Sequence, residues 1–96
     1  MIVRWSAHFH ADLKSIYDFI SGRSQQGARR VVERVFAAAD RLSDMPAIGR
    51  PGQAPGTREF VVATTPYIIV YEVGGADVVL LRLLHGAQRW PPADDR

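Results

Sequence analysis

Residues 78–91 have the sequence VVLLRLLHGAQRWP, an apolar run that contains one arginine and ends in a polar cluster. A run of this composition predicts a buried strand from Val78 to His85. A guanidinium inside such a strand needs a partner, because burying an unpaired charge is costly. We therefore expect Arg82 to face a groove, an acidic partner or a carboxylate.

Two more strands are predicted just before this one. Residues 57–64 and 67–73 are rich in β-branched and aromatic side chains. Thr65-Pro66 and Gly74-Gly75 separate the three runs, and both pairs favour the turns of antiparallel hairpins. Residues 45–56, which come earlier, contain three prolines and three glycines and are predicted to form a loop. The C-terminal half is thus predicted to consist of three antiparallel strands.

Helical periodicity dominates the N-terminal half. Residues 1–5 alternate and predict a short strand, and Ser6 is a suitable N-cap for a helix that follows it. Apolar residues then recur every three or four positions in two successive segments. They are Phe9, Leu13, Ile16, Tyr17 and Ile20 in the first, and Ala28, Val31, Val32, Val35, Phe36, Ala39 and Leu42 in the second. Gly22 and the short link over residues 23–27 predict an antiparallel helical hairpin.

These elements predict an α+β fold with the order strand, two helices and three strands, in which the helical hairpin packs on one face of the sheet. No repeat or linker divides the chain. We expect a single domain over residues 1–91, followed by a frayed C-terminal tail over residues 92–96.

Composition excludes several kinds of function. The chain has no cysteine, which excludes disulfides and thiol catalysis. Lys14 is the only lysine, so the formal net charge of +2 comes from arginines, which suit binding better than proton transfer. His8 and His10 lie on different sides of a helix, and Gly49 and Gly52 lack the rest of a phosphate-binding loop. No metal or cofactor is expected, and without a signal peptide or an apolar span we expect a cytoplasmic protein.

Several short motifs follow one another in a characteristic order. They are Arg4-Trp5-Ser6, Ala11-Asp12-Leu13, Pro46-Ala47-Ile48-Gly49-Arg50, Arg58-Glu59-Phe60, Tyr67-Ile68-Ile69-Val70-Tyr71, and residues 79–85 followed by Trp90 and Pro91. Together they resemble the RelE/ParE superfamily of bacterial toxins over nearly the whole chain. The resemblance implies the toxin of a type II toxin–antitoxin pair. RelE-like members are ribosome-dependent mRNA endonucleases, whereas ParE-like members share the fold and poison DNA gyrase.

Residue chemistry favours the ParE-like branch. Arg58 and Arg82 stand at positions similar to the arginines that neutralise phosphate in RelE-like toxins, but RNA cleavage also needs groups that accept and donate protons. Residues 45–57 contain no lysine, and Trp90 stands where such ribonucleases commonly have a tyrosine. An indole is no practical acid or base. His85 is the remaining candidate for proton transfer.

We therefore expect a ParE-like toxin that inhibits DNA gyrase by binding, is not an enzyme, and forms a hetero-oligomer with a ParD-like antitoxin whose C-terminal tail wraps around it. The resemblance implies no membrane partner and no sequence-specific DNA binding. Residues expected to contact the antitoxin or the target are Arg50, Arg58, Arg82, His85, Arg89 and Trp90.

Three alternatives stay open. The first is a RelE-like mRNA endonuclease that uses Arg58, Arg82 and His85. The second is a protein with the toxin fold that acts only as a structural or regulatory partner. At the level of single residues, Arg58 and Arg82 can instead pair internally with Glu59 or Glu72, and Trp90 can cover the end of the core.

Overall fold

A computed structural model describes residues 1–86 of the chain. Arg89, Trp90 and the tail predicted over residues 92–96 lie outside the described residues, as does the domain boundary predicted at residue 91. The elements are β1 (Ile2–Trp5), α1 (Ala7–Ser21), α2 (Gln25–Asp44), β2 (Arg50–Pro51), β3 (Thr57–Val61), β4 (Tyr67–Gly74) and β5 (Asp77–His85). The predicted α+β class is confirmed.

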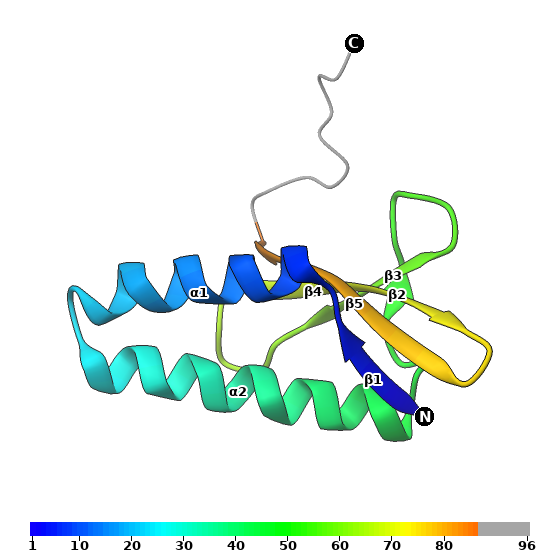
Figure 1. Ribbon diagram of the computed structural model, residues 1–96, viewed down its shortest axis with the longest axis horizontal. Helices are drawn as coiled ribbons and strands as arrows, with labels where there is room; N and C mark the ends of the chain where they lie inside the picture. The colour runs from blue at the N-terminus through cyan, green and yellow to red at the C-terminus, as the bar shows by residue number, and fades with distance from the viewer. Residues whose placement is uncertain (87–96) are drawn as a thin grey trace, which may run out of the picture.

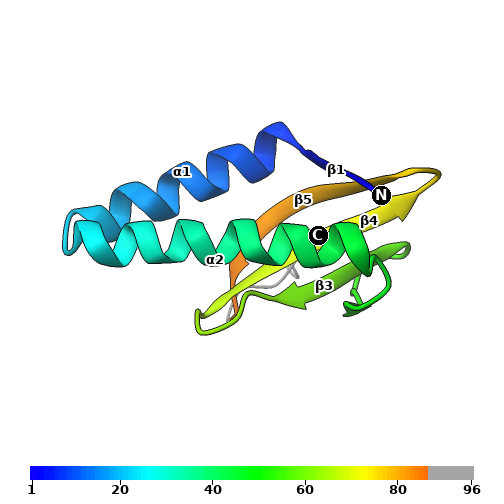
Figure 2. The same ribbon diagram turned by 90° about the horizontal axis from the view of Figure 1, so that it is seen from below.

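Capping side chains fix the helical hairpin. Ser6 is the N-cap of α1, where its hydroxyl accepts a 3.0 Å hydrogen bond from the backbone N–H of Phe9. Ser24 does the same for α2, accepting from Gly27 N–H at 2.9 Å. Each cap satisfies a backbone donor that the first turn of a helix leaves unpaired. Only residues 22–24 separate the helices, which lie side by side with their connecting turn projecting past the strands (Figures 1 and 2).

The sheet has five strands in the order β1-β5-β4-β3-β2. β3, β4 and β5 form the predicted antiparallel meander, and Gly75, with φ +58°, supplies the left-handed position in the tight turn between β4 and β5. β1 joins the meander by pairing in parallel with β5, from Ile2 opposite Asp77 to Trp5 opposite Leu80. The sheet is therefore mixed rather than purely antiparallel.

Two details of the sheet correct the sequence analysis. Residues 45–56 are not entirely loop, because Arg50 and Pro51 pair with β3 as the short strand β2. Proline is tolerated there because β2 is the edge strand and needs no further donor. β3 also ends at Val61 rather than Thr64, whose positive φ of 59° belongs to the following turn.

The core lies between the helical hairpin and one face of the sheet. Its fully buried side chains include Phe9 from α1, Val35 and Leu42 from α2, and Ile69 and Leu80 from the sheet. The predicted helical stripes supply most of these contacts. Two stripe residues are exceptions, because Tyr17 is exposed on α1 and the Phe36 side chain is 53% exposed. Phe36 packs against the ring of Trp5 at the margin of the core, while Ala38 is buried instead.

Within residues 1–86, neither helix has the length and apolar character needed to cross a membrane.

A buried tyrosine hydroxyl organises the loop after α2. Tyr71 donates a 2.8 Å hydrogen bond to the carbonyl of Pro46 and accepts one of 2.8 Å from Gly49 N–H. Burial raises the pKa of Tyr71, which further favours the protonated hydroxyl that donates to Pro46. This contact explains the glycine of the Pro-x-x-Gly-Arg motif, because a Cβ on Gly49 would lie 2.5 Å from the hydroxyl oxygen and 2.8 Å from the carbonyl of Glu59.

Replacing Gly49 should therefore be costly. We expect Gly49→Ala to lower the free energy of unfolding by about 1 to 3 kcal/mol, as for other substitutions that overfill a packed site. Urea unfolding followed by circular dichroism measures the change. Gly74→Ala is the matched control, because a Cβ there meets no atom within 4 Å. Equal stability of the two variants would show that the loop moves aside freely.

Candidate functional site

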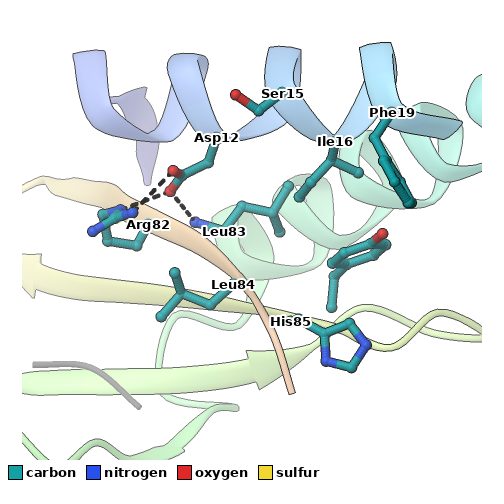
Figure 3. Close-up of a pocket in the computed structure, with 9 residues that line it drawn as sticks. Asp12, Ser15, Ile16, Phe19, Arg82, Leu83, Leu84 and His85 are labelled. Atoms are coloured by element: carbon teal, nitrogen blue, oxygen red, sulfur yellow. Dashed lines mark hydrogen bonds and ion pairs between the residues drawn. The ribbon is translucent and has the colours of Figure 1, made fainter. Parts of the chain in front are cut away.

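A groove of about 350 Å³ lies between α1 and the end of β5. Figure 3 shows its walls, which come from the middle of α1 on one side and the last residues of β5 on the other. The lining residues are Asp12, Ser15, Ile16, Phe19, Tyr67, Arg82, Leu83, Leu84 and His85. The groove thus brings together Arg82 and His85, two of the residues predicted from the sequence to bind a partner.

The groove exists because α1 replaces β1 along the edge of β5. The parallel pairing of β1 ends at Leu80, which leaves this edge of β5 without a neighbouring strand from Leu81 onward, while β4 stays paired along the other edge. Ser6 Oγ donates a 3.0 Å hydrogen bond to the carbonyl of Leu81, and Asp12 Oδ2 accepts one of 2.9 Å from Leu83 N–H. Side chains of the helix thereby satisfy edge groups that would otherwise be open to pairing.

A β-bulge lies at the same point of β5. Val70 pairs with Arg82 and Tyr71 with Leu80, so β5 carries Leu81 as an extra residue between two pairs that are adjacent on β4. A bulge bends its strand and changes the direction of nearby side chains. Here it coincides with the change from β1 to α1 as the neighbour of β5.

Asp12 and Arg82 form a two-point ion pair across this edge. The Arg82 Nε atom lies 2.7 Å from Oδ2 and its Nη2 atom 3.0 Å from Oδ1 of Asp12 (Figure 3). The Arg82 side chain is only 31% exposed and that of Asp12 only 16%, so the pair is partly shielded from water. These hydrogen bonds raise the pKa of Arg82. The predicted carboxylate partner exists, but it is Asp12 rather than Glu59 or Glu72.

Asp12 was not singled out from the sequence, although its spacing contains the signal. It follows Phe9 by three residues and precedes Ile16 by four, so it lies on the apolar face of α1. A carboxylate on that face requires a buried or half-buried partner. Arg82, the arginine predicted within an apolar strand, was the natural candidate for that partner.

Of the other predicted arginines, Arg50 and Arg58 are the two within residues 1–86; they lie elsewhere and also have internal partners. Arg58, on β3, donates from Nη1 to the carbonyls of Gly49 at 2.7 Å and Ala47 at 3.3 Å. Arg50, on β2, is directly opposite Glu59 and contacts its Oε1 atom at 2.9 Å through Nη2. Neither Arg50 nor Arg58 lines the groove.

The rest of the groove is largely apolar. Ile16, Phe19 and Leu84 line it, and the Phe19 side chain is 63% exposed. His85 lies at the end of β5, where its ring meets that of Tyr67 edge to face at 5.9 Å between centroids. Such a surface suits apolar side chains of a partner, with a few polar groups at its rim.

Comparison with known proteins identifies the family. Residues 3–90 match the family described as the ParE toxin of the type II toxin–antitoxin system parDE. This chain belongs to the ParE toxin family. The resemblance to RelE/ParE toxins inferred from the motifs is thereby confirmed.

Individual relatives agree with this assignment. A Sinorhizobium fredii protein with the name "Putative toxin Y4kP" is 40% identical over 89 residues, covering 93% of this ParE-family chain and 92% of the relative. Toxin RelE2 of Caulobacter vibrioides is 36% identical over 86 residues, covering 90% and 96%. A solved chain of a chromosomal ParDE system from P. aeruginosa superposes with a TM-score of 0.80 at 25% identity, covering 88% of this chain and 95% of that one. The relatives' names thus include both RelE and ParE types.

Removing Asp12 should destabilise the fold. Asp12→Ala leaves both the Arg82 guanidinium and Leu83 N–H without their acceptor, and we expect a loss of about 2 to 3 kcal/mol in the free energy of unfolding. Chemical denaturation measures it. Asp18→Ala, which breaks the exposed pair with Lys14 on the same helix, should leave the midpoint almost unchanged. Comparable losses in both variants would mean that Asp12 acts only as a surface charge.

Proposed function

We propose that this ParE-family protein is a toxin that inhibits DNA gyrase by binding it and that a cognate antitoxin neutralises it. The observation that carries the proposal is the two-point contact between Asp12 and Arg82. An arginine whose planar donor edge is already occupied by a carboxylate is poorly suited to gripping a scissile phosphate. The proposal places the protein in the cytoplasm, where gyrase acts.

The chemistry of the remaining candidates also favours binding over catalysis. Cleavage of RNA through the 2′-hydroxyl needs a base, an acid and a cation close together. Arg58 is engaged with the carbonyls of the loop and lies outside the groove, so within residues 1–86 His85 is the one residue of the predicted catalytic set that lies in the groove with Arg82. One imidazole next to a neutralised guanidinium is an incomplete set for this reaction.

The antitoxin is proposed to cover the groove between α1 and β5. The P. aeruginosa match comes from a ParDE toxin–antitoxin system, which supports a ParD-like partner and a hetero-oligomer for this chain. Ile16, Phe19 and Leu84 offer apolar contacts to an amphipathic segment that folds as it binds. Arg82 then contacts the antitoxin as a polar group at the rim of the groove that is already paired with Asp12, and it does not need a carboxylate from the antitoxin.

An mRNA endonuclease is the second candidate, because one relative is named RelE2 and because His85 lies in the groove with Arg82. In this alternative the histidine moves the proton, and ribosome binding has to displace Asp12 from the guanidinium. It therefore makes catalysis depend on His85, whereas the binding proposal does not.

Two assays on the purified protein separate the candidates. We expect inhibition of gyrase supercoiling at concentrations near that of the enzyme, and no cleavage of mRNA on translating ribosomes. His85→Ala should keep most of the supercoiling inhibition, because the binding proposal assigns no proton transfer to the imidazole. Message cleavage by the unmodified protein that is lost in His85→Ala would replace the proposal with the endonuclease.

A further inference from the structure

We propose that Asp12 determines the ligand specificity of Arg82: by occupying the guanidinium, it prevents Arg82 from binding the phosphate groups of RNA. Asp12 is then more than a structural contact. It is the residue that separates a protein-binding groove from a phosphate-binding one on the same scaffold.

Geometry makes the contact difficult to displace. Asp12 engages Nε and Nη2 of Arg82 at 2.7 and 3.0 Å, which is the side-on edge that a phosphate would also use for two parallel hydrogen bonds. The carboxylate is itself held by Leu83 N–H at 2.9 Å. A phosphate must therefore compete with an anion that is covalently part of the fold and already oriented.

The charge balance of the groove leads to the same conclusion. Among its lining residues, Asp12 and Arg82 carry opposite formal charges that cancel, and no other lysine, arginine, aspartate or glutamate lines the groove within residues 1–86. RNA binding relies on unneutralised cations, because affinity comes largely from displacing counterions from phosphates. With Asp12 in place, the groove offers no net positive charge to a phosphate.

The inference rests on the proposed function, in which Arg82 is not a catalytic phosphate ligand, but its readout is RNA affinity rather than gyrase inhibition or message cleavage. Asp12→Asn is the test variant, because the amide oxygen still accepts from Leu83 N–H while the negative charge is lost. A fluorescein-labelled single-stranded RNA serves as the probe, titrated with the full chain and followed by anisotropy at several salt concentrations.

We expect Asp12→Asn to raise RNA affinity about two- to fivefold, as for one charge pair formed near the surface. The slope of log affinity against log salt should steepen by about 0.7, the value for one additional phosphate contact on a single strand. The double variant Asp12→Asn with Arg82→Gln should lose this gain. Circular dichroism establishes that each variant is folded.

Asp18→Asn is the matched control, because it removes the same charge from α1 at an exposed pair with Lys14. A gain no larger than that of Asp18→Asn, or a gain that persists when Arg82 is glutamine, overturns the inference. If Asp12→Asn does not fold, the RNA affinity of Arg82→Gln in the otherwise unchanged chain tests the inference instead. It should cost no more RNA affinity than Arg29→Gln on the exposed face of α2, and a several-fold larger loss contradicts the role of Asp12.

The two proposals fail in different assays. If gyrase is not inhibited but the gain that depends on Arg82 is observed, the proposed target is rejected and the role of Asp12 stands. If gyrase is inhibited and Asp12→Asn binds RNA no better than Asp18→Asn, the proposed target stands and the role of Asp12 is rejected.

Discussion

The structure depends on how α1 covers the unpaired edge of β5. β1 is only four residues long and leaves that edge at Leu80, yet the strand continues to His85. Asp12 and Ser6 take the place of a neighbouring strand by bonding to Leu83 N–H and the Leu81 carbonyl. The same helix inserts Phe9 into the core, so the position of α1 that covers the edge of β5 is also the position that packs the core. The groove lies between α1 and the end of β5.

Arginine has a consistent structural use in this small protein. Arg82 neutralises Asp12, Arg58 binds two carbonyls of the loop after α2, and Arg50 is paired with Glu59 across the edge of the sheet. In each case the guanidinium has an acceptor within the fold, either a carboxylate or a loop carbonyl. Its five donors in a fixed plane make arginine better suited to this than lysine. An arginine-rich composition therefore need not indicate a surface for nucleic acid.

The sequence predicted the local elements well and the long-range contacts poorly, for physical reasons. Ser6, Gly22 and the apolar spacing act within a few residues, so the hairpin follows from them directly. The parallel pairing of β1 with β5 joins residues more than seventy positions apart and has no local signature. Periodicity also marks which face of a helix is apolar but not how far the core extends beneath it, which is why Phe36 was assigned to the core although it lies at its margin.

The candidate site shows the same division. Arg82 and His85 were found because an arginine and a histidine are unusual in an apolar strand. The spacing of Asp12 marks it as a carboxylate on an apolar helix face, but its pairing with Arg82 follows only from the placement of α1 against that strand.

Once the strand arginines are paired internally, the positive charge available to a partner lies elsewhere. Arg29, Arg30, Arg34 and Arg41 are exposed on α2, and none forms an ion pair within residues 1–86. None of them lines the groove. Glu33, Asp40 and Asp44 are also exposed on α2, so the four arginines leave this helix with a formal excess of only one positive charge. A charge placed over the neutral Asp12–Arg82 pair would lose water and gain no counter-charge, so in the proposed complex the groove selects its partner by apolar fit.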